Sequence, residues 1–340
     1  MDILIKSFNR PFYLDRCISS IYKFVSGDFS IKVLDDGTPV KYLTKIQEKY
    51  PDITIIKSDN YHQKCQAIDG NLKRGTEING FQIPTKLWKE AALSSSDYFI
   101  MAEDDVWFTK DICISETEKV MVHNKIFLLK LGWISNRKIK SKETPIKNSN
   151  LISIKPKIFI APSYIMNYFF DNKFKLFSLL YKLKMVDNTT KNEYWIMNSL
   201  LMGVYSKKYW LALWENIDGK VDELQQIKNA VKWFRKNKRN THSYTRLDKL
   251  IMNTTFISSA TNSYHQYGYN CDINVFNHIM NEEWFNENFN SLQNFPSDFS
   301  ANYIKKFLDK ANNERCSYTE WLKWSNQFKQ QYRDQDVIVD

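Results

Sequence analysis

The chain has 340 residues, of which 43% are hydrophobic and 15% aromatic, with only 9 Gly and 8 Pro. This composition excludes a disordered or low-complexity chain and indicates one large core or two closely packed lobes. Lysine and arginine number 48 against 38 acidic residues, a formal net charge of +10 that favours anionic partners such as nucleotide diphosphates, acidic lipid headgroups or nucleic acid. Because the charge is spread along the chain, it is equally consistent with a generally lysine-rich composition.

Five isolated cysteines argue against a zinc finger or a disulfide scaffold, and they suit a reducing compartment. They are Cys17, Cys65, Cys113, Cys271 and Cys316. The first residues resemble a strand that Asn9-Arg10-Pro11 ends, not a signal peptide. No stretch reaches the ~20 apolar residues of a membrane helix. We therefore expect a cytoplasmic protein.

Apolar runs and amphipathic stretches alternate over the first hundred residues. Four runs are predicted to be buried strands, at residues 3–7, 30–34, 53–56 and 98–102. Amphipathic stretches predicted to be helices follow the first and second strands and precede the fourth. This order indicates right-handed crossovers and a parallel sheet covered on both faces. The polar segment 60–84 is longer than most loops, which suggests a functional excursion at the edge of the sheet.

Beyond residue 105 the pattern is mixed. Predicted strands cover 126–131, 151–154 and 254–258, predicted helices cover 194–201 and 222–236, and a Lys-rich loop covers 136–150. The tail from 303 to 333 is predicted to be helical, with Trp321, Trp324, Phe328 and Tyr332 at near-helical spacing. This aromatic stripe is either a packing face or, with neighbouring lysines, a contact with a membrane surface.

The strongest chemical signal is the acidic run Glu103-Asp104-Asp105, which directly follows the fourth predicted strand. In open α/β sheets, ligands bind beyond the carboxyl ends of the strands. Three consecutive carboxylates repel one another, so a cation or solvent must compensate them. Mg²⁺ and Mn²⁺ take such oxygen ligands together with substrate phosphates. The alternative is a solvated acidic turn.

A second acidic pair, Asp35-Asp36, follows the second predicted strand and precedes Gly37. One of these carboxylates could accept a hydrogen bond from a nucleobase N–H. An Asp-Gly turn without any ligand is the ordinary alternative.

Three motifs match a known family in order. They are Asn9-Arg10-Pro11 after the first strand, Asp35-Asp36-Gly37-Thr38 after the second, and Glu103-Asp104-Asp105-Val106 after the fourth. Over residues 1 to about 110 the sequence resembles the inverting bacterial glycosyltransferases of family 2 and their GT-A relatives. The resemblance implies an α/β GT-A fold, with a Rossmann-like nucleotide-binding sheet (1–125), a mixed α+β acceptor-binding half (126–270) and a helical C-terminal region (271–340).

The resemblance also implies an activity, namely transfer of a sugar from a nucleotide diphosphate sugar to a glycan or lipid-linked acceptor in polysaccharide biosynthesis. A UDP-sugar is the donor we expect, Mn²⁺ or Mg²⁺ the cofactor, and inversion the outcome. The residues implied to hold the nucleotide sugar are Ser7, Asn9, Arg10, Asp35, Asp36 and Asp104, with Asp104 near the ribose. Asp105 is implied to ligate the metal. A lipid-linked acceptor would place the protein at the inner face of the membrane.

Other assignments leave alternatives open. Lys86, at the start of a predicted helix, is our candidate for the diphosphate, and a solvated lysine is the alternative. Asp222 or Glu223 is implied as the general base, unless the pair only caps its helix or Glu215 or Asp218 takes the role. His265 is the candidate for a late metal ligand, although a lone histidine is more often structural.

Two other classes of function compete with this hypothesis. A nucleotidyltransferase acting on sugar phosphates would share the acidic metal ligands, but it would normally carry a Gly-rich loop after the first strand, where the sequence reads Ser7-Phe8-Asn9-Arg10. A non-catalytic nucleic-acid-binding protein is suggested by charge alone. No binding motif supports it, and the acidic run opposes it. We therefore expect no nucleic-acid partner.

Overall fold

The structure is a computed structural model, and it describes residues 1–132, 141–188, 190–199, 202–257, 268–334 and 339. Its strands are β1 (Asp2–Ser7), β2 (Val25–Ser26), β3 (Ser30–Asp35), β4 (Thr54–Lys57), β5 (Tyr98–Glu103), β6 (Val106–Phe108), β7 (Ile112–Cys113), β8 (Leu128–Lys130), β9 (Ser141–Pro145), β10 (Leu151–Pro156), β11 (Gly203–Ser206), β12 (Tyr244–Leu247) and β13 (Met252–Thr254).

The α-helices are α1 (Pro11–Phe24), α2 (Val40–Lys49), α3 (Tyr61–Arg74), α4 (Thr85–Leu93), α5 (Ile114–His123), α6 (Ser163–Phe170), α7 (Leu176–Lys182), α8 (Lys207–Leu213), α9 (Glu223–Asn237), α10 (Ile273–Phe285), α11 (Ala301–Ala311) and α12 (Tyr318–Arg333). Two 3₁₀ turns are η1 (Lys173–Lys175) and η2 (Asn192–Met197).

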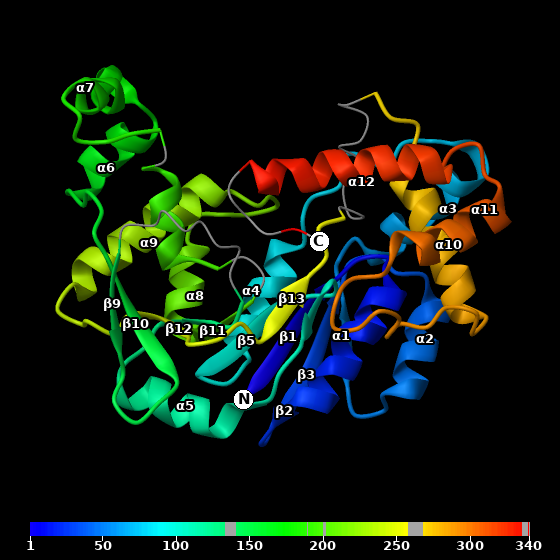
Figure 1. Cartoon of the computed structure of the whole chain (residues 1–340), viewed down its shortest axis with the longest axis horizontal. Coiled ribbons are helices and arrows are strands. Elements are labelled where there is room, and N and C mark those ends of the chain that lie inside the picture. The colour runs from blue at the N-terminus through cyan, green and yellow to red at the C-terminus, as the bar shows by residue number, and fades with distance from the viewer. Residues whose placement is uncertain (133–140, 189, 200–201, 258–267, 335–338, 340) are drawn as a thin grey trace.

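A nine-stranded sheet in the order β4-β3-β1-β5-β11-β8-β12-β10-β9 runs through the centre of the molecule (Figure 1). Strands β4, β3, β1 and β5 are parallel, whereas β11 runs antiparallel to β5 and begins the mixed half. Ser7 pairs in register with Asp35, and Lys6 pairs with Glu103. The carboxyl ends of β1, β3 and β5 therefore share one edge. The predicted α/β class, with a parallel nucleotide-binding-type half and a mixed second half, is confirmed.

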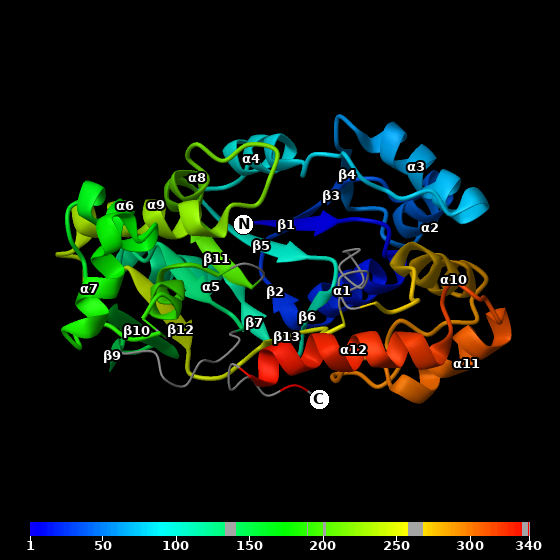
Figure 2. The same cartoon turned by 90° about the horizontal axis from the view of Figure 1, so that it is seen from above.

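Both faces of the parallel half are buried, which explains why its strands are apolar at successive positions. Ile3 and Ile5 pack on one face with α1, α2 and α10, while Leu4 packs on the other face with α4, α8 and α9. Figure 2 shows α4 and α8 on one side of the sheet and α10 and α12 on the other. This sandwich is the arrangement that the alternating pattern predicts.

The segment 60–84 differs from its prediction, because its first part is the helix α3. Tyr61, Lys64 and Ile68 are buried at helical spacing, and the helix ends at Gly75, whose φ of 70° is the left-handed value that glycine adopts readily. The polar composition of this helix concealed its period. Only the residues after Gly75 form the irregular excursion.

Elements of the second half also differ in extent from their predictions. The predicted helix at 194–201 is the shorter 3₁₀ turn η2. The predicted strand at 254–258 is wrong over residues 255–257, because β13 (Met252–Thr254) shares only Thr254 with it, and residue 258 lies outside the described residues. The predicted Lys-rich loop contains the strand β9, and its residues 136–140 lie outside the described residues. The helix predicted at 222–236 is confirmed as α9.

The predicted helical tail is confirmed as two helices, α11 and α12. Trp321 and Trp324 are fully buried against α10, so the aromatic stripe packs into the core. In Figure 1, α12 crosses the molecule above the ends of β1 and β5. Among the described residues, no helix combines the length and apolarity needed to cross a membrane.

Candidate functional site

The acidic run leaves the end of β5 and meets the loop after β1. Arg10 lies at this junction because Pro11 starts helix α1 directly behind it. Its guanidinium donates from Nη1 to Asp105 Oδ2 at 2.7 Å and from Nη2 to Asp104 Oδ1. The cation that three adjacent carboxylates require is therefore supplied by the protein itself.

Asp104 is the deepest member of the run, with a fully buried side chain. Its second oxygen, Oδ2, accepts a hydrogen bond from the backbone N–H of Phe8 at 3.1 Å. Burial raises the pKa of Asp104 to about 7, although the charge of Arg10 lowers it. Asp104 thus joins the end of β5 to the loop after β1.

Asp105 differs from Asp104 in keeping one oxygen unused. Its Oδ2 binds Arg10, whereas Oδ1 is buried and has no hydrogen-bond partner among the residues that the structure describes. The backbone carbonyl of Asp105 accepts from Thr255 N at 3.2 Å and from Thr254 Oγ1 at 3.1 Å, which fixes the position of the residue. A buried carboxylate oxygen without a donor is a ready ligand for a cation.

The two aspartates after β3 have different roles. Asp35 is fully buried and accepts hydrogen bonds from Gly37 N, Thr38 N and Thr38 Oγ1, so it builds its own loop. Burial raises the pKa of Asp35 to about 6. Asp36 points instead toward α3, where Oδ2 contacts Lys64 Nζ. Its other oxygen, Oδ1, is buried without a hydrogen-bond partner among the described residues.

A cavity of about 440 Å³ opens at the shared edge of β1, β3 and β5. It is lined by Lys6, Ser7, Phe8, Arg10, Asp36, Lys64, Ile78, Asn79, Gly80, Phe81, Ile83, Pro84, Trp88, Glu103 and Val221. Three cations and two carboxylates face it, together with aromatic rings from three segments. A cavity of this size, with mixed charge and aromatic walls, suits a nucleotide rather than an apolar ligand.

The cations of the cavity are already partly paired. Lys6 Nζ lies 3.3 Å from Glu103 Oε1 and 4.4 Å from the centre of the Trp88 ring. Lys64 Nζ contacts Asp36 and donates to the backbone carbonyl of Gln82 at 3.0 Å. Burial raises the pKa of Glu103 against the lowering effect of Lys6. These pairs hold the long side chains in place at the cavity wall.

The candidate bases lie at the start of α9. Asp222 is the N-cap, and its side chain accepts from Gln225 N at 2.9 Å, which lowers its pKa. Glu223 is exposed. Burial is the main cause that raises the pKa of Tyr332, and the charges of Asp105, Glu223 and Glu103 raise it further. The three carboxylates therefore all lie within electrostatic range of Tyr332 on α12.

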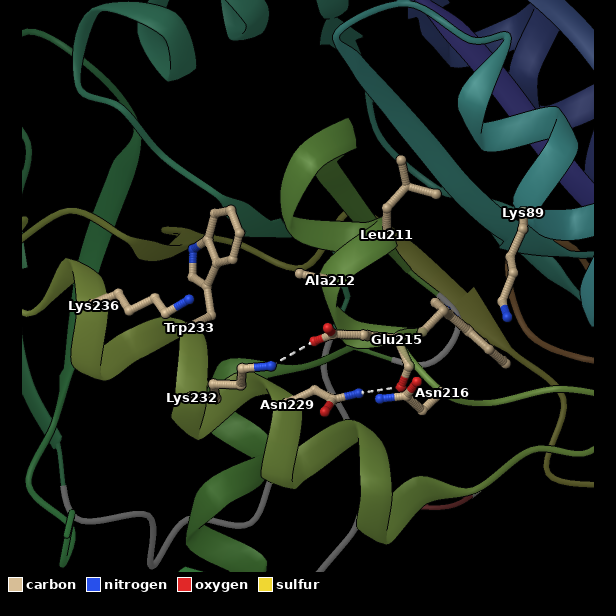
Figure 3. Close-up of a pocket in the computed structure, with 10 residues that line it drawn as sticks. Lys89, Leu211, Ala212, Glu215, Asn216, Asn229, Lys232, Trp233 and Lys236 are labelled. Atoms are coloured by element: carbon tan, nitrogen blue, oxygen red, sulfur yellow. Dashed lines mark hydrogen bonds and ion pairs between the residues drawn. The ribbon is translucent and has the colours of Figure 1, made fainter. Parts of the chain in front are cut away.

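The two upstream carboxylates lie elsewhere. Glu215 lines a second cavity of about 460 Å³ between α8 and α9, where its carboxylate binds Lys232 Nζ at 2.8 Å (Figure 3). Asp218 is exposed and binds Lys89 at 2.6 Å. Neither residue lines the cavity at the strand ends.

Three other predicted site residues are placed away from the cavity or are not described. Asn9 is buried and hydrogen-bonds Asn274 and Asn281 of α10, so its side chain anchors that helix. Lys86 is exposed and binds Asp59 at 2.9 Å, outside the lining. His265 lies outside the described residues. The roles of Asn9, Lys86 and His265 stay predictions.

Sequence reasoning missed Lys64, Lys6 and Trp88. Lys64 was recoverable, because Tyr61, Lys64 and Ile68 follow helical spacing and a lysine on an apolar face is unusual. The sequence pointed to Lys6 only in that it is a charged residue inside an otherwise apolar strand. Trp88 is buried in the core with the other apolar side chains of α4, and it also lines the cavity.

Comparisons with known proteins give likeness in structure only. No family model matches the chain, and no curated protein matches its sequence. S. aureus TarS in complex with UDP-GlcNAc is similar over 99% of this chain and 83% of that chain, at 12% identity and a TM-score of 0.43.

Two further structures are comparable. The mannosyltransferase PcManGT from Pyrobaculum calidifontis, in complex with GDP-Man and Mn²⁺, covers 98% of this chain and 74% of its own at 8% identity and a TM-score of 0.38. The galactosyltransferase LgtC, in complex with donor and acceptor sugar analogues, is similar over 75% of this chain and 86% of its own, at 10% identity and a TM-score of 0.36. At these values none of them defines a family for this chain.

Proposed function

We propose that this chain is a GT-A-type glycosyltransferase, which moves a sugar from a nucleotide diphosphate sugar to a glycan or lipid-linked acceptor. The observation that supports this most is the cavity where β1, β3 and β5 end. There Lys6 and Arg10 pair with the acidic run, and Lys64 pairs with Asp36. Ligands of open α/β sheets bind at this edge, and both signs of charge are needed for a diphosphate held with a divalent cation.

The donor would lie with its diphosphate toward the three cations. Asp36 Oδ1, buried without a donor among the described residues, would accept the N–H of the nucleobase. The rings of Phe8, Phe81 and Trp88 line the same cavity and offer apolar surface to a base or sugar ring. Asp35 would contribute only indirectly, by shaping the loop that carries Asp36.

A divalent metal, Mn²⁺ or Mg²⁺, fits one residue of the site well. Asp105 would hold it through Oδ1, which has no donor within the described part of the chain. Asp104 is less suitable, because both of its oxygens are used by Arg10 and Phe8. When bound, such a metal supplies charge neutralisation at the leaving diphosphate. His265 stays a predicted second ligand.

The acceptor hydroxyl would be deprotonated by Glu223. Asp222 is engaged as the N-cap of α9, whereas Glu223 is exposed and, like Asp105 and Glu103, raises the pKa of Tyr332. A single carboxylate that activates the hydroxyl gives direct displacement on the face opposite the diphosphate, and hence inversion. We further propose a cytoplasmic location, which the five free thiols support.

The test is a donor screen. UDP-, GDP- and dTDP-sugars are incubated with the purified chain and Mn²⁺, and release of the nucleoside diphosphate is measured. We expect hydrolysis with one nucleotide class, a UDP-sugar first, and no release of pyrophosphate. Release of pyrophosphate from a nucleoside triphosphate and a sugar phosphate would instead identify a nucleotidyltransferase.

A further inference from the structure

Residues 163–186, which we call the α6–α7 projection, stand off from the body of the molecule at the far side from α10–α12. They comprise α6, η1 and α7 and the four residues after α7. Figure 1 shows the projection at the upper left, and Figure 2 shows it at the left end of the molecule. It takes no part in the cavity at the strand ends.

The projection is unusually apolar on its outside. Seven of the 16 exposed large hydrophobic side chains of the described chain lie in these 24 residues. They are Tyr164, Tyr168, Phe174, Leu179, Tyr181, Leu183 and Met185. Phe174 is 89% exposed and Met185 63%. Such a concentration marks an interaction surface, because single exposed apolar residues are normally scattered.

The exposure does not reflect a lack of internal packing. Met166, Phe169 and Phe170 are buried. The centroid of the Phe169 ring lies 5.3 Å from that of Phe177 and 6.1 Å from that of Tyr194. The projection therefore packs its inner side chains into the core that it shares with η2, α8 and α9, and it still presents a second apolar set outward.

The backbone around the exposed Phe174, at the tip of the projection, adopts an unusual conformation. Asn172, Phe174 and Lys175 all have positive φ, at 50°, 52° and 57°. A bulky residue such as phenylalanine rarely adopts this conformation, which costs free energy. A left-handed turn that exposes an aromatic ring is more easily explained by a function than by stability.

Four lysines surround the apolar side chains. Lys173, Lys175, Lys182 and Lys184 are all exposed. The only acidic residue of the segment is Asp171, and it pairs with Lys228 of α9 at 2.7 Å. The projection thus carries a positive charge around an apolar, aromatic surface.

We propose that the α6–α7 projection docks this protein on the surface of a bilayer that contains anionic lipid. Aromatic and aliphatic side chains enter the interface, and lysines extend their ammonium groups to the headgroups. A protein partner fits less well, because protein–protein interfaces are depleted in lysine, and four lysines surround this surface. The inference does not depend on the proposed reaction.

The test measures partitioning of the full chain onto vesicles by flotation at 0.1 M NaCl. Vesicles of phosphatidylcholine with about 30% phosphatidylglycerol are compared with pure phosphatidylcholine. The apolar variant is Phe174→Ser/Leu183→Ser/Met185→Ser, and its matched control is Leu93→Ser/Val122→Ser/Leu292→Ser, at exposed apolar positions on the body. The charge variant is Lys182→Gln/Lys184→Gln, with Lys110→Gln/Lys119→Gln as control.

We expect the wild type and both controls to float with the anionic vesicles. The apolar variant should partition roughly 1,000-fold less, since each of its three side chains contributes about tenfold. The charge variant should partition about 25-fold less, at about fivefold per lysine. Circular dichroism and thermal unfolding confirm that each variant is folded. The proposal is overturned if the wild type does not float, if apolar variant and control behave alike, or if the projection instead mediates concentration-dependent dimerisation in size-exclusion chromatography.

Discussion

Arg10 Nη1 donates a hydrogen bond to Asp105 Oδ2 at 2.7 Å, joining the loop after β1 to the end of β5 across 95 positions of the chain. The same guanidinium binds Asp104, so one buried cation compensates two buried carboxylates. The arrangement keeps the acidic run in place before any ligand binds. It also leaves Asp105 Oδ1 as the oxygen available to a metal.

Replacing Arg10 by glutamine should destabilise the fold, because two buried carboxylates lose their cation. We expect a loss of about 3–5 kcal/mol in the free energy of unfolding, measured by urea denaturation at pH 7. Lys86→Gln is the control, since Lys86 forms an exposed pair with Asp59, and its unfolding midpoint should not change. Equal midpoints for Arg10→Gln and the wild type would show that the buried pairs do not form.

Asp36→Ala should weaken binding of the nucleoside diphosphate by ~1–3 kcal/mol, because a buried hydrogen bond to the base is lost. Calorimetry with UDP and Mn²⁺ measures this. Asp35→Asn is the comparison, because the Asp35 side chain accepts three hydrogen bonds from Gly37 and Thr38 of its own loop. This change should lower the stability of the fold more than the affinity of the folded protein for UDP. Unchanged affinity in Asp36→Ala would remove Asp36 from the nucleotide site.

Glu223→Gln should lower sugar transfer by about 10²–10⁴-fold while donor binding stays normal, as expected for a general base. Asp222→Asn is the matched control, because asparagine is also a good N-cap and preserves the start of α9. Single-turnover kinetics and NMR of the product anomer provide the measurements. If only Asp222→Asn loses activity, the base is Asp222, and retained configuration in the product would exclude direct displacement altogether.

Lys130 gives a prediction about pH. It lies in β8 and donates to the carbonyl of Trp195 at 2.7 Å, and burial lowers its pKa to about 8. Above pH 8 the folded state has released this proton while the unfolded state still binds it, so stability should rise between about pH 8 and 10.5. The gain should approach about 3 kcal/mol.

The control for this pH dependence is Lys130→Met, in which the titrating group is absent. Its unfolding free energy should lack the rise that the wild type shows between pH 8 and 10.5. Parallel curves for the two proteins over this range would contradict the burial of a charged Lys130.

The order of elements could be predicted in the first hundred residues because strands there are buried on both faces and appear as continuous apolar runs. The helix α3 gives a weaker signal, since its exposed face is so polar that its period shows mainly in the spacing of Tyr61, Lys64 and Ile68. The sheet order β5-β11-β8-β12 was beyond reach, because these pairings join residues more than 70 positions apart. Sequence spacing carries no information on such contacts.

The clustering of three candidate residues was predictable from the ends of the strands. Asp36, Arg10 and Asp105 come together because β1, β3 and β5 are neighbours and parallel. Lys86, predicted to bind the diphosphate from its position before the fourth strand, pairs with Asp59 at the surface in the first turn of α4, and its role stays a prediction. The direction in which a residue points from the helix axis decides whether it faces the cavity. Trp88, two positions after Lys86 in α4, lines the cavity.

The most direct test of the account is the Asp105→Asn variant, assayed for donor turnover against Mn²⁺ concentration beside the wild type. Asparagine keeps the size of the side chain, and Arg10 keeps its bond to Asp104, so the fold should be intact by circular dichroism. Losing a charged metal ligand costs several kcal/mol in the transition state, which corresponds to a loss on the order of 10³-fold or more. The account predicts this loss, and wild-type activity abolished by EDTA and restored by Mn²⁺. Near wild-type turnover in Asp105→Asn, or full wild-type activity in excess EDTA, would contradict it.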